Sequence, residues 1–152
     1  MRLLRLSAAV YLLTALAARA ATPPFPNLSG VTLLSTDGAF AIPDNASVIS
    51  LLTVTGLPGA IVDVDVTIDI IHPQSDQLDI FLVSPSGRTV TLTTDCGRDN
   101  DDVFAGTTFD DQAGSNVRNF TFTDKVVATP LQPEEAMAAF NGESAEGPWR
   151  SW

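Results

Sequence analysis

The chain has 152 residues, a length typical of one domain. Its 18 acidic residues against 8 basic ones give a net charge of −10, which argues against a nucleic-acid partner because phosphates are held by Lys and Arg. The single histidine, His72, and the single cysteine, Cys96, exclude zinc fingers, HExxH metalloproteases and disulfides within the chain.

The first twenty residues have the pattern of a secretory signal peptide. Arg2 and Arg5 make a positive start, Leu6–Ala18 is apolar, and Ala18-Arg19-Ala20 has the small-x-small form of a cleavage site. The apolar run is shorter than the roughly 18 to 20 residues that span a bilayer, so a signal is favoured over a membrane anchor. We therefore expect Met1–Ala20 to be removed, leaving a secreted or periplasmic protein without membrane contact. Residues 21–41 are expected to form a Pro-rich linker and a lead-in strand.

The rest of the sequence consists of short β-rich segments. The clearest predicted strand is Ile61–Ile70, in which Val or Ile at every second position alternates with Asp or Thr. Ser84-Pro85-Ser86-Gly87 suits a type I turn between two strands, and a short helix is expected between Pro133 and Gly142. The further predicted strands are Ser47–Thr55, Leu78–Val83, Thr89–Thr94, Gly106–Phe109 and Val117–Thr123. This pattern predicts an all-β fold of antiparallel strands, a jelly-roll β-sandwich.

Several short motifs occur in the order and spacing of one known family. They are Ile42-Pro43-Asp44-Asn45, Gly56-Leu-Pro-Gly59, the Val/Asp strand ending in His72, Leu78-Asp79-Ile80-Phe81-Leu82, Ser84-Pro85-Ser86-Gly87, Thr107-Thr108-Phe109-Asp110-Asp111, and Ala139-Phe140-Asn141-Gly142 through Gly147-Pro148-Trp149. Together they resemble the P domain, or P/Homo B domain, of kexin- and furin-like proprotein convertases. The resemblance implies that residues 42–152 form a β jelly roll. Such a domain follows a subtilisin-like serine protease domain and supports its folding, stability and calcium dependence.

Two features depart from the family pattern. Asp76-Gln77 stands where the family usually has Gly-Asp, which moves an acidic group by one residue and so to the other face of the strand. The sequence also ends just after the Gly-x-Trp motif at Trp149, so roughly two family strands are expected to be missing, leaving an unpaired sheet edge. The P domain is therefore expected to be incomplete at its C-terminus.

Acidic residues crowd the loops after two predicted strands and suggest calcium. Ca²⁺ takes six to eight oxygen ligands at roughly 2.3–2.6 Å, and clustered Asp carboxylates supply them. The candidate ligands are Asp95, Asp99, Asp101, Asp102, Asp110 and Asp111. The resemblance implies calcium in such loops, and the alternative is a solvated acidic loop that keeps the protein soluble. Asp63, Asp65 and Asp69 are predicted to form a solvated face, since alternate residues of a strand lie about 6.6 Å apart, wide for sharing one ion.

The sequence lacks the motifs of serine hydrolases. It contains neither a G-x-S-x-G elbow nor a subtilisin-type serine motif, and His72 is expected to be a hydrogen-bonded structural residue. We therefore predict a non-catalytic P/Homo B module that stabilises a subtilisin-like protease catalytic domain or another exported protein, or that binds one in a calcium-dependent way. The alternatives are a jelly-roll module that binds carbohydrate or a surface protein, and a truncated remnant without function. Trp149 is expected in the core rather than in a sugar-binding platform.

Overall fold

Antiparallel strands make up almost all regular structure in the computed structural model, which describes residues 4–5, 10–15, 30–35, 41–43 and 46–152. In chain order the strands are β1 (Leu4–Arg5), β2 (Val10–Ala15), β3 (Gly30–Leu33), β4 (Ser50–Val54), β5 (Ala60–Ile61), β6 (Val66–Ile70), β7 (Asp79–Val83), β8 (Thr89–Thr94), β9 (Ala105–Phe109) and β10 (Gly147–Ser151). Short 3-10 turns form at η1 (Ser75–Gln77), η2 (Val117–Asn119) and η3 (Met137–Phe140). The predicted all-β, antiparallel class is confirmed, whereas the jelly-roll topology stays a prediction.

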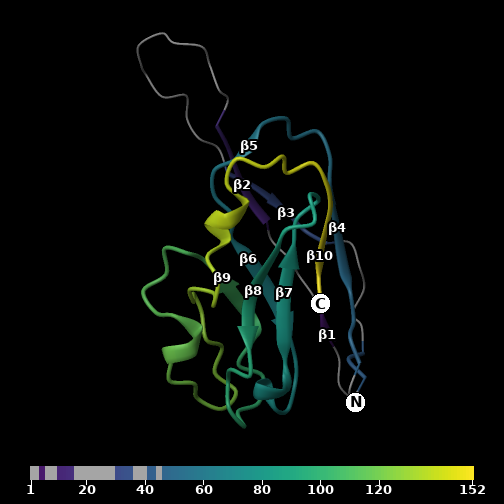
Figure 1. The fold of residues 1–152 in the computed structure, drawn as a ribbon. Coiled ribbons are helices and arrows are strands. Elements are labelled where there is room, and N and C mark those ends of the chain that lie inside the picture. Colours follow the sequence, from purple (N-terminus) through teal and green to yellow (C-terminus); the bar gives the residue numbers. More distant parts are fainter. Residues whose placement is uncertain (1–3, 6–9, 16–29, 36–40, 44–45) are drawn as a thin grey trace.

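The strands form three sheets, with the orders β4-β10-β7-β8, β1-β6-β9 and β3-β2-β5. Figure 1 shows β10, the last strand of the chain, lying between β4 and β7. Every pairing of these strands is antiparallel. β10 therefore joins an early strand of the domain to the β7–β8 hairpin.

The predicted signal segment, Met1–Ala20, lies largely outside the described residues. Its described parts are β1 and β2, which pair with β6 and with β3 and β5. The signal peptide stays a prediction. Within the described ranges, no helix is long and apolar enough to cross a membrane.

The core lies between the inner faces of the sheets. It is built from the side chains that alternate with more exposed ones along each strand. In β6 the side chains of Val66, Ile68 and Ile70 are buried, while the residues between them are half-buried. Trp149 of β10 is 1 % exposed and packs edge-on against Phe140 of η3, with ring centroids 5.1 Å apart. Because each fully buried large apolar side chain contributes about 1.5–3 kcal/mol, this alternation fixes which face of each strand points inward. The expected core position of Trp149 is confirmed.

Most predicted strands form, with differences that the pairing explains. β8 has the predicted bounds, and β4, β7 and β9 lie within about two residues of theirs except at the start of β4. The predicted strand Ile61–Ile70 is divided into β5 and β6. The division arises because β9 ends at Phe109, opposite Val66, while Ile61 exchanges backbone hydrogen bonds with residues 142 and 143.

Two predicted elements are wrong. The predicted strand Val117–Thr123 is instead the turn η2 followed by irregular chain, because the Asn116 side chain accepts a hydrogen bond from the Arg118 N–H and closes a local turn. The predicted helix between Pro133 and Gly142 is reduced to η3. The chain bends at residues 134 and 135 instead, and their backbone N–H groups donate to carbonyls of β8.

The predicted turn at Ser84-Pro85-Ser86-Gly87 is confirmed. The Gly87 N–H donates to the Ser84 carbonyl at 2.9 Å, which is the bond that closes a β-turn. Gly87 has a φ of +89°, a backbone conformation that glycine adopts without a steric penalty. The turn joins β7 to β8 in a hairpin, and residues 95–102, which are rich in Asp, follow β8 at its far end.

Candidate functional site

The acidic loop, residues 95–102, is held against η1 by backbone contacts. The N–H groups of Ser75 and Asp76 donate to the carbonyls of Asn100 and Arg98, at 3.1 and 3.0 Å. Gly97 has a φ of +100°, and a Cβ built there would lie 2.5 Å from the Ser75 Cβ, so only glycine fits. Two carbonyls of the acidic loop are therefore already used by the fold.

The carboxylates of the acidic loop do not converge on one point. Asp95 and Asp99 are exposed, while Asp101 and Asp102 are half-buried. An Asp101 oxygen lies 3.6 Å from the Lys125 Nζ, which gives this carboxylate a cation of its own. In the part of the chain that the structure describes, no group of three or more His, Cys, Asp or Glu side chains is placed to hold a metal ion.

Asp110 and Asp111 follow β9 and lie in a different environment. Asp110 accepts a hydrogen bond from the Gln112 N–H through its Oδ1 atom. The two oxygens of Asp111 accept from the backbone N–H groups of Met137 and Ala138, at 2.9 and 2.7 Å. Asp111 therefore fixes the start of η3 beside the end of β9.

The charges of Asp63, Asp110 and Asp111 all act on Asp65, and we call these four residues the acidic corner. One carboxylate oxygen of Asp65 is buried and has no hydrogen-bond partner among the described residues. Burial, followed by the charges of Asp110, Asp63 and Asp111, raises the pKa of Asp65 from 3.8 to about 6. The prediction of a solvated face is therefore wrong for Asp65.

The register of β6 and β9 explains the acidic corner. Val66 is paired with Phe109, so the residues just outside the pair, Asp65 and Asp110, are neighbours across the sheet. The alternation around Asp65 and the motif ending in Asp110 and Asp111 are both visible in the sequence. What the sequence does not supply is the register that places them opposite each other.

Two glutamates that the sequence analysis did not single out hold loops to the sheet. Glu134, with a side chain 4 % exposed, accepts from the Thr94 N–H at 2.7 Å and from the Thr94 hydroxyl at 3.0 Å, and forms an ion pair with Arg118. Burial acts to raise the pKa of Glu134, but these hydrogen bonds and the Arg118 charge outweigh it and hold the pKa below its usual value. Glu143 accepts similarly from Ser84, Ser86 and Arg88. Both carboxylates have structural roles.

His72 and Cys96 are likewise part of the fold. His72 is 4 % exposed, and its Nδ1 atom lies 2.7 Å from the Gln74 carbonyl oxygen, which confirms the expected structural role. Cys96 is a free cysteine whose thiol donates to the Glu134 carboxylate at 3.6 Å. Burial and the neighbouring Glu134 charge raise the pKa of the Cys96 thiol, which lowers its reactivity.

Comparison with known protein families identifies the family of this chain. The family model described as the proprotein convertase P-domain matches residues 61–151, from β5 to the end of β10. No curated protein and no solved structure matches the chain. The matched residues contain the acidic loop, the acidic corner and both structural glutamates. The chain belongs to the proprotein convertase P-domain family, whose domains are associated with subtilisin-like convertases.

Proposed function

We propose that this protein is a non-catalytic P domain that stabilises a subtilisin-like protease catalytic domain or another exported protein. The observation that carries the proposal is the family match over residues 61–151. The roles of His72 and Cys96 in the fold agree with it, because the two side chains most suited to catalysis contact Gln74 and Glu134. The carbohydrate-binding alternative has less support, because Trp149 is buried against Phe140.

The proposal includes a Ca²⁺ ion at the acidic corner, whose carboxylates are not gathered into a group of three ligands in this structure and would have to move together on binding. Calcium binds clustered carboxylate oxygens, and a cation beside Asp65 would offset the repulsion from Asp110 and Asp111 that accompanies its raised pKa. The buried Asp65 oxygen without a hydrogen-bond partner fits such a ligand. Of the six residues predicted from the sequence, this argument favours Asp110, because both oxygens of Asp111 already accept hydrogen bonds at the start of η3. Bound there, Ca²⁺ would supply charge neutralisation that ties β6 to β9.

The acidic loop is the weaker calcium candidate. The carbonyls of Arg98 and Asn100 accept hydrogen bonds from η1, and Asp101 lies beside Lys125. The remaining carboxylates of the acidic loop do not converge on one point; they belong to Asp95, Asp99 and Asp102. We propose that the acidic loop packs against η1, and that calcium-dependent interaction with a partner depends on the acidic corner.

An exported location is part of the same proposal. It rests on the pattern of Met1–Ala20 and on membership of a family associated with secreted or exported convertases. After loss of that segment the domain has no residues predicted to contact a membrane. Detection of a mature N-terminus at Ala21 in the exported fraction would support the proposal, and an uncleaved protein retained in the cytoplasm would contradict it.

A test of the proposed function measures protection of a protease. The purified chain is added to a kexin-like catalytic domain without its own P domain, and residual peptidase activity is followed at raised temperature. We expect a half-life at least threefold longer than with an equal amount of an unrelated acidic β-sandwich protein. Equal half-lives with the two additions would contradict the proposal.

A further inference from the structure

The segment that follows η2 carries a motif for attachment of an N-linked oligosaccharide. Asn119, Phe120 and Thr121 match the pattern Asn-x-Ser/Thr in which x is not proline. The Asn side chain accepts the sugar, and the sugar is bulky and polar, so a folded domain can hold it only at its surface. The value of the motif therefore depends on where the fold places Asn119 and Thr121.

Phe120 and Phe122 anchor this segment and leave Asn119 and Thr121 in solvent. The Phe120 ring packs edge-on against Phe122, with ring centroids 5.1 Å apart, and Phe122 packs edge-on against Phe104 at 5.8 Å. Phe104 is fully buried and the other two rings are half-buried, whereas Asn119 and Thr121 are exposed. A sugar on Asn119 would therefore extend away from the core without displacing a packed side chain.

The side chain of Asn119 is not used by the fold. Its backbone N–H donates to the Asn116 carbonyl at 3.0 Å and closes η2, but no hydrogen bond joins its side-chain amide to any described residue. Asn116, three residues earlier, differs, because its side chain accepts from the Arg118 N–H and donates to the Pro133 carbonyl. Of these two amides, that of Asn119 is available for reaction.

The backbone around the motif is also accessible. Residues 120–123 have no regular secondary structure, and the N–H and C=O groups of residues 120–122 form no backbone hydrogen bond with a described residue. Phe120 is extended, with a φ of −73° and a ψ of 142°. A transferase that must hold the motif in its own active site therefore breaks no strand pairing, whether it acts before or after folding.

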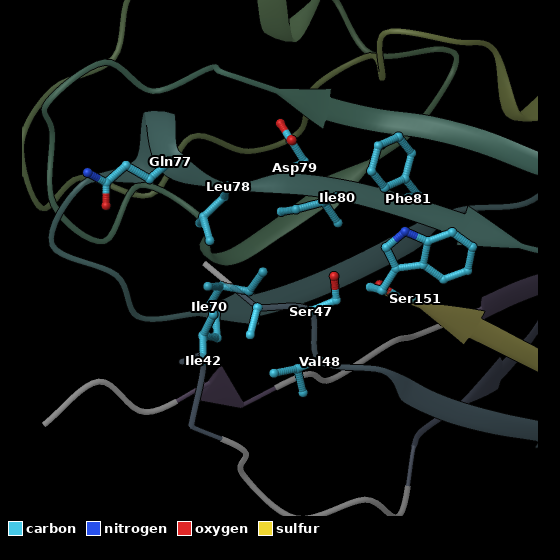
Figure 2. Close-up of a pocket in the computed structure, with 12 residues that line it drawn as sticks. Ile42, Ser47, Val48, Ile70, Gln77, Leu78, Asp79, Ile80, Phe81 and Ser151 are labelled. Carbon is cyan, nitrogen blue, oxygen red and sulfur yellow. The ribbon is translucent and has the colours of Figure 1, made fainter. Parts of the chain in front are cut away.

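Two further copies of the pattern lie early in the chain. They are Asn27-Leu28-Ser29 and Asn45-Ala46-Ser47. Asn27 and Asn45 lie outside the described residues, and Ser47 lines a groove beside β7 (Figure 2). These two copies carry no structural argument, and they serve as comparisons within the same chain.

We propose that Asn119 accepts an N-linked oligosaccharide when the chain is exported. The Asn119 Nδ2 atom forms a bond to the anomeric carbon of an oligosaccharide carried on a polyprenyl diphosphate. The bond from that carbon to the diphosphate oxygen breaks, the diphosphate leaves with the electron pair, and the amide proton passes to a base of the transferase. The exporting cell supplies the transferase and the lipid-linked donor. The inference rests on the exported location proposed above and goes beyond it, because it assigns a modification to a defined residue.

The test translates the full chain in a cell-free system with endoplasmic-reticulum microsomes. Imported chains, which added protease does not digest, are treated with peptide-N-glycosidase in H₂¹⁸O, and mass spectrometry locates each modified Asn as ¹⁸O-labelled Asp. We expect the label at residue 119 in at least half of the imported chains. A smaller fraction, whatever the state of Asn27 and Asn45, would overturn the proposal and leave the exported location intact. Chains that stay outside the microsomes would contradict both.

Substitutions in the motif separate its recognition from folding. Thr121→Ala should remove the label at residue 119, whereas Thr121→Ser, which keeps the hydroxyl, should retain it. Asn119→Gln should lower the mass of the imported chain by one oligosaccharide. Both positions are exposed, so we expect all three variants to keep the melting curve of the natural chain. A label that persists in Thr121→Ala would overturn the proposal, because deamidation rather than sugar transfer would then be its source.

Discussion

Glu134 and Asp65 are both poorly exposed carboxylates, but their surroundings have opposite effects. Hydrogen-bond donors and Arg118 surround Glu134 and hold its pKa below the usual value. Asp65 is surrounded by other carboxylates, one of its oxygens lacks a donor among the described residues, and its pKa is raised to about 6. The comparison distinguishes a carboxylate that stabilises the fold from one that a cation or proton would stabilise.

We expect the largest effect on the free energy of unfolding from removing the carboxylate of Glu134, which has several hydrogen-bond donors. Glu134→Ala leaves the Thr94 N–H without its acceptor, and a buried unsatisfied donor costs about 1–3 kcal/mol. With the Arg118 ion pair also lost, we expect the free energy of unfolding to fall by about 2–3 kcal/mol in urea denaturation. Glu135→Ala is the matched control, since Glu135 also accepts from a β8 N–H, that of Thr91, but is exposed. Equal losses in the two variants would remove the contrast with Asp65.

Calcium should stabilise the acidic corner around Asp65 rather than the surroundings of Glu134. At tenfold excess over its dissociation constant, a ligand of the folded state alone stabilises by about 1.4 kcal/mol. We therefore expect millimolar CaCl₂ to raise the melting temperature of the chain relative to EGTA, and the Asp110→Asn variant to lose most of this rise. Asp99→Asn is the control, because Asp99 is exposed in the acidic loop, away from the acidic corner. Loss of the rise in Asp99→Asn alone would move the calcium site to the acidic loop.

Neutralising Asp65 should stabilise the protein when no cation is present. Asp65→Asn removes a charge that is repelled by Asp110, Asp63 and Asp111, while keeping the size of the side chain. Because the site is partly open to solvent, we discount the repulsion strongly and expect a gain of about 1 kcal/mol at pH 7 in EGTA. The measurement is urea denaturation beside Asp69→Asn, which changes a half-buried aspartate of β6 outside the acidic corner. A loss of stability in Asp65→Asn would mean that its charge is already compensated.

The sequence predicted the local parts of this fold well and the long-range parts poorly. The bounds of β8 and the turn at Ser84–Gly87 depend on residues within a few positions of one another, so composition and spacing were sufficient. The helix expected after Pro133 failed because residues 134 and 135 pair with β8, some forty positions earlier, which no local pattern reveals. Strand propensity at Val117–Thr123 was likewise overridden by the hydrogen bond that the Arg118 N–H donates to the Asn116 side chain.

In the candidate site, too, the local features were predictable from the sequence and the long-range contacts were not. Clustered aspartates made the acidic loop conspicuous, but its backbone contacts with η1 are invisible in the sequence. Asp110 and Asp111 were identified as candidates, and their neighbour Asp65 was assigned to a solvated face. Only the register of Val66 opposite Phe109 places Asp65 beside Asp110, and a shift of one residue would have turned it to the other face.

The smallest effect, and the most specific, is the pH dependence of the gain from Asp65→Asn. The folded-state pKa of Asp65, about 6, lies above its ordinary value of 3.8, so the folded protein holds this proton more tightly than the unfolded chain. Folding is therefore not penalised by Asp65 below about pH 3.8, and the penalty develops as pH rises through 6. Glu134 acts with the opposite sign, because its lowered pKa contributes stability that is lost as pH falls.

The difference in unfolding free energy between Asp65→Asn and the natural chain isolates Asp65, because Glu134 is present in both proteins. In EGTA at constant ionic strength, this difference should be near zero at acid pH, increase by a few tenths of a kcal/mol per pH unit, and level off above pH 6 at about 1 kcal/mol. Millimolar CaCl₂ should lower the plateau or reverse its sign, since a bound cation favours the charged form of Asp65 and so lowers its folded-state pKa toward or below 3.8. A difference that is the same at every pH would show that Asp65→Asn acts through packing, and the contrast between the two carboxylates would then not be electrostatic.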